Sequence, residues 1–261
     1  MIPYIARIMA TQNNNDRAAW LQGPSAQCET SQSQSTSWRL ILLGAPGVGK
    51  GTQADLLHQR LRACHLSTGD VFRAASKSQC ELSPAMKAAM EYMRRGALVP
   101  DATVWEMVCE RSGCLHCAGG FILDGFPRTL AQAESLKRLL EGEGIPLTAV
   151  VNYALPTNEI VARLSGRRTC DKCRTVFHVV DRPPKVEGCC DRCDGKLFQR
   201  EDDQPESIKV RLEAYDRSTA PLIAFYKKLG VLLTVGASGS PDEICEKTLA
   251  GLQQRSAAQA G

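Results

Sequence analysis

The residues best suited to chemistry form a glycine-rich segment, Gly-Ala-Pro-Gly-Val-Gly-Lys, from Gly44 to Lys50. Its G-x-x-x-x-G-K spacing follows a short apolar run at 39–43 and precedes a stretch of helical periodicity. Glycines let consecutive backbone N–H groups turn toward a phosphate, and the next helix adds the positive end of its dipole. Lys50 is placed to reach the β- and γ-phosphates as a point charge. The segment therefore predicts a loop that holds nucleotide phosphates.

Two residues near this loop, Thr52 and Asp124, bear on how a magnesium ion would be bound. The hydroxyl that commonly follows the lysine occurs one place later here, in Thr52, because Gly51 intervenes. We therefore expect Thr52 to contact phosphate without ligating magnesium in the usual way. A second apolar run, 121–123, ends at Asp124. An acid at the carboxyl end of a strand beside a phosphate loop is placed to hold Mg²⁺ through water; an N-cap role for Asp124 is the alternative.

Two cysteine pairs give the second chemical signal. Cys170-x-x-Cys173 is followed after 16 residues by Cys190-x-x-Cys193. Paired knuckles at this spacing are typical of a tetrahedral structural zinc site, with iron or a redox pair as alternatives. Residues 167–203 have no long apolar period, so bound metal could stabilise a small inserted module there. Another C-x-x-C, Cys114 to Cys117, has no second pair nearby and predicts a packing role.

Short apolar runs alternate with helical patterns along the chain, which predicts an α/β fold with a parallel sheet. The expected strands are 39–43, 121–123, 149–153 and 231–235. The expected helices are 50–63, 84–95, 101–113, 129–141, 156–166, 204–229 and 241–254.

Composition narrows the class of protein. The chain has 261 residues, 43% apolar and 23% charged, and a net charge of +4, which does not favour a nucleic-acid binder. No apolar stretch is long enough for a membrane span, and no secretory signal is evident. We expect reduced thiols, a cytoplasmic location, a disordered polar extension over 1–37 and a flexible tail over 255–261.

Several motifs, taken in order from about residue 39 to 254, resemble adenylate kinase. They are Gly44 to Gln53, Ser67 to Asp70 with Arg73, Asp124 to Thr129, Gly166 to Arg168, and Arg200 to Asp203. The resemblance implies a P-loop nucleoside triphosphate hydrolase-like three-layer core over 38–254. Within it lie a helical region at 67–99 that binds the monophosphate and a zinc-binding lid at 166–203, as in the long form of the family. It also implies a monomer that uses Mg²⁺ and converts ATP and AMP reversibly to two ADP.

The resemblance also assigns residues to each nucleotide. For ATP it implies Gly47, Val48, Gly49, Lys50, Gly51, Thr52, Arg163, Arg167, Val176, Phe177 and Gly239. For AMP it implies Thr68, Arg73, Ala97, Leu98, Val99, Gly125, Phe126, Pro127, Arg128 and Gln132, with Gln132 bonded to the adenine edge. It also implies that Arg200 and Arg211 reach the phosphates of both nucleotides. The Gly239 assignment rests on a segment that departs from the family pattern. The family has Val-Asp-Gly-Thr here, whereas in this sequence Val235 is followed by Gly-Ala-Ser.

Phosphoryl transfer leaves little covalent work for a protein, so the expected catalytic residues position charge rather than act as a base. They are Lys50, Asp124, Arg128, Arg167, Arg200 and Arg211. A GTP-dependent kinase or one for another monophosphate is the alternative within enzymes. An inactive scaffold, or a zinc-ribbon nucleic-acid binder with a regulatory P-loop, is the alternative outside them. The cysteine segment has no run of Lys or Arg and is followed by Glu201, Asp202 and Asp203, which disfavours nucleic acid.

Overall fold

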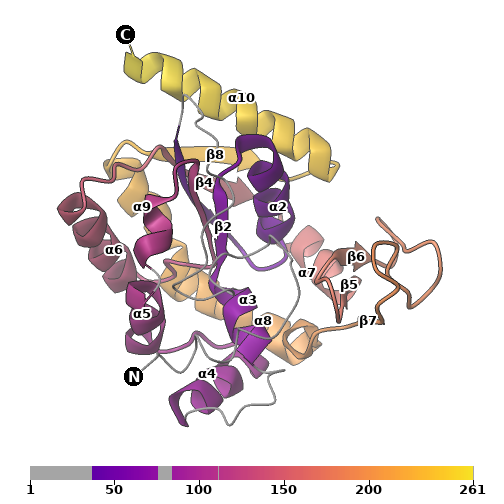
Figure 1. Cartoon of the computed structure of the whole chain (residues 1–261). Helices are drawn as coiled ribbons and strands as arrows, with labels where there is room; N and C mark the ends of the chain where they lie inside the picture. The colour runs from indigo at the N-terminus through magenta and orange to yellow at the C-terminus, as the bar shows by residue number, and fades with distance from the viewer. Residues whose placement is uncertain (1–36, 76–83, 111, 261) are drawn as a thin grey trace.

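The computed structural model describes residues 37–75, 84–110 and 112–260 (Figure 1). At its centre is a five-stranded sheet with the strand order β2-β3-β1-β4-β8. Every neighbouring pair in this sheet is parallel, as the alternating sequence pattern predicts. The strands are β1 Trp38–Gly44, β2 Cys64–Ser67, β3 Gly120–Asp124, β4 Ala149–Ala154 and β8 Leu232–Gly236.

Helices cover both faces of this sheet, which gives three layers (Figure 1). Because side chains alternate along β1, Leu40 and Leu42 pack on one face and Ile41 and Leu43 on the other. The first face meets α2 (Lys50–Leu61) and α10 (Pro241–Ala260), which lie side by side. The second face meets α5 (Asp101–Glu110), α6 (Leu130–Gly142) and α9 (Pro221–Lys228).

Two smaller parts are attached to this core. One consists of α3 (Thr68–Ala75) and α4 (Pro84–Arg94), which follow β2 and contact each other. The other follows α7 (Thr157–Ser165) and contains a three-stranded antiparallel sheet. Its strands are β5 Arg167–Cys170, β6 Val176–His178 and β7 Leu197–Phe198. This module, here called the lid, projects from the core at the right of Figure 1.

The structure differs from the sequence prediction at several element boundaries. The four-residue strand β2 was not predicted. The helix expected over 204–229 is divided into α8 (Pro205–Ala214), a π-helical turn at Tyr215–Thr219 and α9, which begins at a proline. The last helix continues to Ala260 instead of ending at 254. Within the stretch predicted as a tail, Arg255 donates hydrogen bonds to the carbonyls of Leu232 and Gly230, 3.1 and 2.5 Å away.

Other predictions concern the ends and the cysteines. The extension predicted over 1–37 lies outside the described residues, except for Ser37. The expectation of reduced thiols is wrong for Cys64, which is disulfide-bonded. Cys117 packs against the core, in agreement with the predicted packing role. Among the described residues, no helix combines the length and apolar character needed to cross a membrane.

Candidate active site

The glycine-rich loop connects β1 to α2, as its sequence predicts. Gly49 is the N-cap of α2 and has a φ of 100°, a left-handed conformation that glycine adopts without strain. Gly47 also has a positive φ, 82°, and a Cβ there would lie 2.6 Å from Cγ of Leu164 on α7. The loop therefore requires glycine both for its turn and for its close approach to α7. This arrangement leaves backbone N–H groups and the first turn of α2 at the edge of the cavity described next.

A cavity of about 1120 Å³ lies over the carboxyl ends of the central strands, the usual position for a ligand in an open α/β sheet. It collects most of the predicted residues from segments that are far apart in the chain. From the P-loop and its helix come Gly47, Val48, Gly49, Lys50, Gly51 and Thr52. From the remaining segments come Leu98, Asp124, Gly125, Pro127, Arg128, Arg163, Arg167, Val176, Phe177, Arg200, Arg211 and Gly239.

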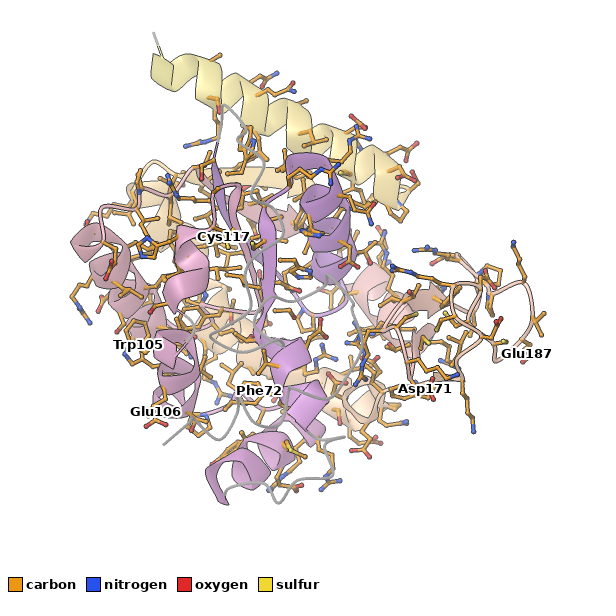
Figure 2. All side chains as sticks on the ribbon, in the orientation of Figure 1. Phe72, Trp105, Glu106, Cys117, Asp171 and Glu187 are labelled. Carbon is orange, nitrogen blue, oxygen red and sulfur yellow. The ribbon has the colours of Figure 1, made fainter. Side chains whose placement is uncertain are left out.

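A narrow slit beside this cavity contains the predicted acceptor residues. Thr68, Val99 and Gln132 line it, and Leu98, Gly125 and Arg128 line both the slit and the larger cavity. Phe72, Met93 and Val104 complete an apolar wall that sequence reasoning did not name. The lining has the apolar walls and few polar groups that suit a purine ring, but the slit holds only about 30 Å³ in this structure and must widen to admit one. The labelled Phe72 of α3 lies toward the core in Figure 2, well away from Asp171 and Glu187 of the lid.

Three residues predicted to bind the acceptor are not among those that line the cavity or the slit. Ala97 donates its backbone N–H to the carbonyl of Tyr92 at 2.9 Å. Phe126 is buried in the core, and its ring centroid lies 6.5 Å from that of Trp105 on α5. Arg73 belongs to α3, but its side chain lies outside those that the structure describes. Phe126 therefore packs in the same core cluster as Phe72 and Val99, which line the slit, and Ala97 belongs to the turn that leads into it.

The buried acid Asp203 holds two of the predicted catalytic arginines together. It is fully buried, and its carboxylate accepts a two-pronged pair of hydrogen bonds from Arg167, with Nε–Oδ2 at 2.7 Å. Arg211 donates to Oδ1 of the same carboxylate at 2.9 Å and to the carbonyl of Asp202 at 2.8 Å. Sequence reasoning placed Asp203 in a family motif, Arg200 to Asp203, and in an acidic flank, but gave it no role of its own. In the fold it orients both guanidinium groups beside the cavity.

The other arginines of the cavity donate hydrogen bonds to carbonyl and hydroxyl oxygens of the core and lid. Arg163 donates to the carbonyl of Ala237 at 3.0 Å and more weakly to that of Val48 at 3.5 Å, so it links the P-loop to the segment after β8. Arg128 is exposed and donates to the carbonyl of Gly125 at 2.7 Å. Arg200 donates to the hydroxyl of buried Thr169 at 2.9 Å. Arg128, Arg163 and Arg200 thus come from three different segments and line one cavity.

The Lys50 ammonium lies in this concentration of positive charge. It donates to the carbonyls of Gly44 and Ala45 at 2.7 and 2.9 Å. Burial lowers the pKa of Lys50 to about 7; the Asp124 carboxylate opposes this shift, while Arg128, Arg211 and Arg167 add to it. A bound polyphosphate would bring further negative charge to this cluster, beyond that of Asp124 and Asp203.

The carboxylate of Asp124 is paired with a buried histidine that sequence reasoning missed. His65 on β2 is 2% exposed, with Nε2 3.6 Å from Asp124 and Nδ1 3.3 Å from Asp55 of α2. Burial lowers the pKa of His65, but the two flanking carboxylates dominate and raise it to about 9. Burial alone would raise the pKa of Asp124, yet contact with His65 and the charge of Lys50 lower it. His65 therefore keeps Asp124 ionised and links it to α2.

The proton on His65 predicts a pH-dependent contribution to stability. Since its pKa rises from 6.5 unfolded to about 9 folded, the contribution is complete below pH 6.5 and lost as pH rises through 9. We expect the stability difference between the wild type and His65→Gln to be largest near pH 6 and to shrink toward pH 10. Urea unfolding across this range, without magnesium, measures it. Exposed His116→Gln is the control, and a difference that is constant with pH would contradict the assignment.

The four lid cysteines gather at one point, as their spacing predicts. The sulfur atoms of Cys170, Cys173, Cys190 and Cys193 all lie within 4.8 Å of one another, and no disulfide joins them. Sγ of Cys170 is 3.4 Å from that of Cys193, and the Cys173 and Cys190 sulfurs are 3.5 Å apart. Tetrahedral zinc with Zn–S bonds of about 2.3 Å places sulfurs about 3.8 Å apart. The donor set and its compactness therefore fit such an ion.

Phe177 belongs to both the lid core and the cavity. It is 4% exposed and packs with Cys170, Cys173, Cys190 and Leu197. It nevertheless lines the large cavity together with Val176, and the guanidinium carbon of Arg182 lies 5.9 Å from its ring centroid. The packing role and the predicted position beside the nucleotide are therefore compatible.

A parallel sheet with a glycine loop before α2, and arginines that converge on it, defines a P-loop phosphate-binding protein. The family model described as adenylate kinase matches residues 42–231. A protein of Caldicellulosiruptor saccharolyticus named adenylate kinase is 53% identical over 196 residues, 75% of this chain and 90% of that protein. Adenylate kinases of Carboxydothermus hydrogenoformans and Streptomyces coelicolor are each 46% identical over 83% of this chain and 100% and 99% of their own lengths. The chain belongs to the adenylate kinase family.

Proposed function

We propose that this protein transfers a phosphoryl group reversibly from ATP to AMP and so forms two molecules of ADP. One observation carries the proposal: the P-loop, Asp124 and arginines from four segments line one cavity that continues into an apolar slit. The cavity provides cationic groups for the phosphates of a donor. The slit provides an apolar slot for the base of an acceptor.

Each group in the cavity has a physical role in this reaction. Lys50 and the P-loop N–H groups hold the donor phosphates, while Arg167 and Arg211 stabilise charge on the oxygens of the transferred group. Arg128 and Arg200 orient the acceptor phosphate, and Asp124 would hold Mg²⁺ through water. Mg²⁺ held there would supply positive charge that offsets part of the negative charge of the phosphates.

The lid supports the same reaction by excluding water. Water could accept the phosphoryl group in place of AMP, so a cover over the donor favours transfer over hydrolysis. We propose that Cys170, Cys173, Cys190 and Cys193 hold a structural zinc ion and thereby fix the lid strands. The four sulfur ligands leave no open position for a substrate, so the metal would have a structural role.

We further propose that the protein acts as a monomer in the cytoplasm, without nucleic acid, and that ATP is preferred to GTP. The adenine preference for the acceptor rests on Gln132, whose side chain lines the slit. For the donor, the preference rests on Arg163, Phe177 and Gly239, which line the cavity.

A coupled assay with several nucleotides tests the reaction. We expect ATP, AMP and Mg²⁺ to give two ADP per AMP consumed, with slower reactions when GTP replaces ATP or when CMP, UMP or GMP replaces AMP. ATP without an acceptor is the control for hydrolysis. If ADP does not form above that control, the kinase proposal is wrong, and a faster reaction with another monophosphate would replace AMP as the acceptor.

A further inference from the structure

The side-chain amide of Gln132 has two hydrogen-bond partners, one that donates and one that accepts. Its Oε1 accepts the backbone N–H of Arg128 at 2.7 Å, and its Nε2 donates to Oδ1 of Asp101 at 2.6 Å. A backbone N–H can only donate and a carboxylate can only accept. These two contacts therefore define which end of the amide is oxygen and which is nitrogen, a distinction that shape alone does not provide.

Asp101 is itself held firmly against the start of α6. Its second oxygen, Oδ2, accepts the hydroxyl hydrogen of Thr129 at 2.9 Å. The same Thr129 hydroxyl accepts the backbone N–H of Gln132 at 3.2 Å and so caps α6. Both carboxylate oxygens of Asp101 are thus engaged by residues of one turn. A 180° rotation of the buried Gln132 amide would oppose two acceptors at Asp101 and two donors at Arg128.

The orientation of this amide matters for a purine in the slit that Gln132 lines. After its two fixed contacts, the amide retains one acceptor position on Oε1 and one N–H on Nε2. A bidentate partner must then offer a donor beside an acceptor, as the 6-amino group and a ring nitrogen of adenine do. In a 6-oxopurine the 6-position is an acceptor and N1 carries hydrogen. The same pose would then place like groups against each other, unless the amide rotated.

We propose that Asp101 determines the specificity for the acceptor base, by locking the Gln132 amide in the orientation that accepts 6-aminopurines and rejects 6-oxopurines. The proposal rests on the proposed function, since it assumes that Gln132 faces the base of the acceptor. It adds a residue outside the cavity lining, which acts through Gln132 rather than on the substrate. Asp101 is therefore a positioning residue.

The test compares AMP with inosine monophosphate, the simplest 6-oxopurine acceptor. In Asp101→Asn the new amide can either donate or accept, so only the backbone N–H of Arg128 still opposes a rotation of the Gln132 amide. We expect the ratio of kcat/KM for AMP to that for inosine monophosphate to fall about tenfold, because an unpaired polar contact no longer opposes the oxopurine. The kcat with saturating AMP should change little, so most of the effect lies in the two KM values.

Two further variants separate specificity from folding. Glu206→Gln removes an exposed carboxylate from the first turn of another helix, α8, and should leave the ratio unchanged. Asp101→Ser also offers a group that can donate or accept, and it replaces the Asn variant if that one does not fold. An equal loss with both acceptors would show that Asp101 is only structural and would overturn the proposal. A wild type that does not phosphorylate AMP would instead contradict the proposed function itself.

Discussion

Lys50→Met is expected to lower kcat/KM for ATP and AMP by about 10³-fold, the size of effect seen when one preorganised charge contact to a transition state is lost. The methionine side chain is similar in length but cannot neutralise phosphate charge. The measurement is the coupled assay with ATP and AMP at fixed Mg²⁺. The residual rate then reports what the backbone N–H groups and the arginines provide without the lysine.

The folded protein should tolerate this change well. Burial holds the Lys50 pKa at about 7, far below 10.5, so the ammonium is costly in the protein without nucleotide. We therefore expect the midpoint of thermal unfolding to stay the same or rise while activity falls. Exposed Lys228→Met on α9 is the matched control for loss of a lysine and should retain full activity. If Lys50→Met keeps more than about half of the wild-type rate, the P-loop role is wrong.

The parts of this site that the sequence predicts well are those whose evidence is local. The P-loop needs a strand, a glycine turn and a helix in direct succession, and β1, Gly44 to Lys50 and α2 supply them in that order. The cysteine knuckles are similarly local, because each C-x-x-C fixes two ligands within one turn. Such signals combine residue type with spacing, so few other structures satisfy them.

The acids that organise the site were missed because their partners are distant in sequence. Asp203 contacts Arg167, which is 36 residues away, and Asp101 contacts Gln132, which is 31 residues away. In the sequence Asp203 follows two other acids and looks like part of a solvated surface. It is buried where it meets Arg167 of the lid and Arg211 of α8, and no local pattern encodes these contacts.

Strand β2 and its histidine were missed for a related reason. Cys64–Ser67 is only four residues long and contains two polar residues, so it lacks the apolar run that marks β1 and β4. Its polar residues are buried because β2 pairs with β3 in the register that places Ser67 beside Asp124. His65 then meets Asp124 and Asp55 at the end of the sheet where the phosphates are expected. The sheet order, rather than the strand's composition, brings this histidine to the site.

Cys173→Ser is expected to remove the lid metal and to loosen the lid strands. Zinc content should fall from about one ion per chain to near background, because three thiolates and a hydroxyl bind zinc far more weakly than four thiolates. The apolar cluster of the lid is small: besides the cysteines it contains only Phe177 and Leu197. A bound ion at about 1,000 times its Kd would add about 4 kcal/mol to its stability. Metal analysis and hydrogen exchange of residues 166–203 measure the two effects.

Cys189→Ser is the matched control, because Cys189 neighbours Cys190 in sequence but its sulfur is not part of the four-cysteine cluster. It should retain the metal and the exchange protection of the lid. In Cys173→Ser we also expect ATP hydrolysis to rise relative to transfer to AMP, since a loose lid admits water to the donor phosphate. Zinc retained in Cys173→Ser, or lost equally in Cys189→Ser, would show that the cluster is not the metal site. Zinc lost without a change in lid exchange would mean that packing alone holds the lid.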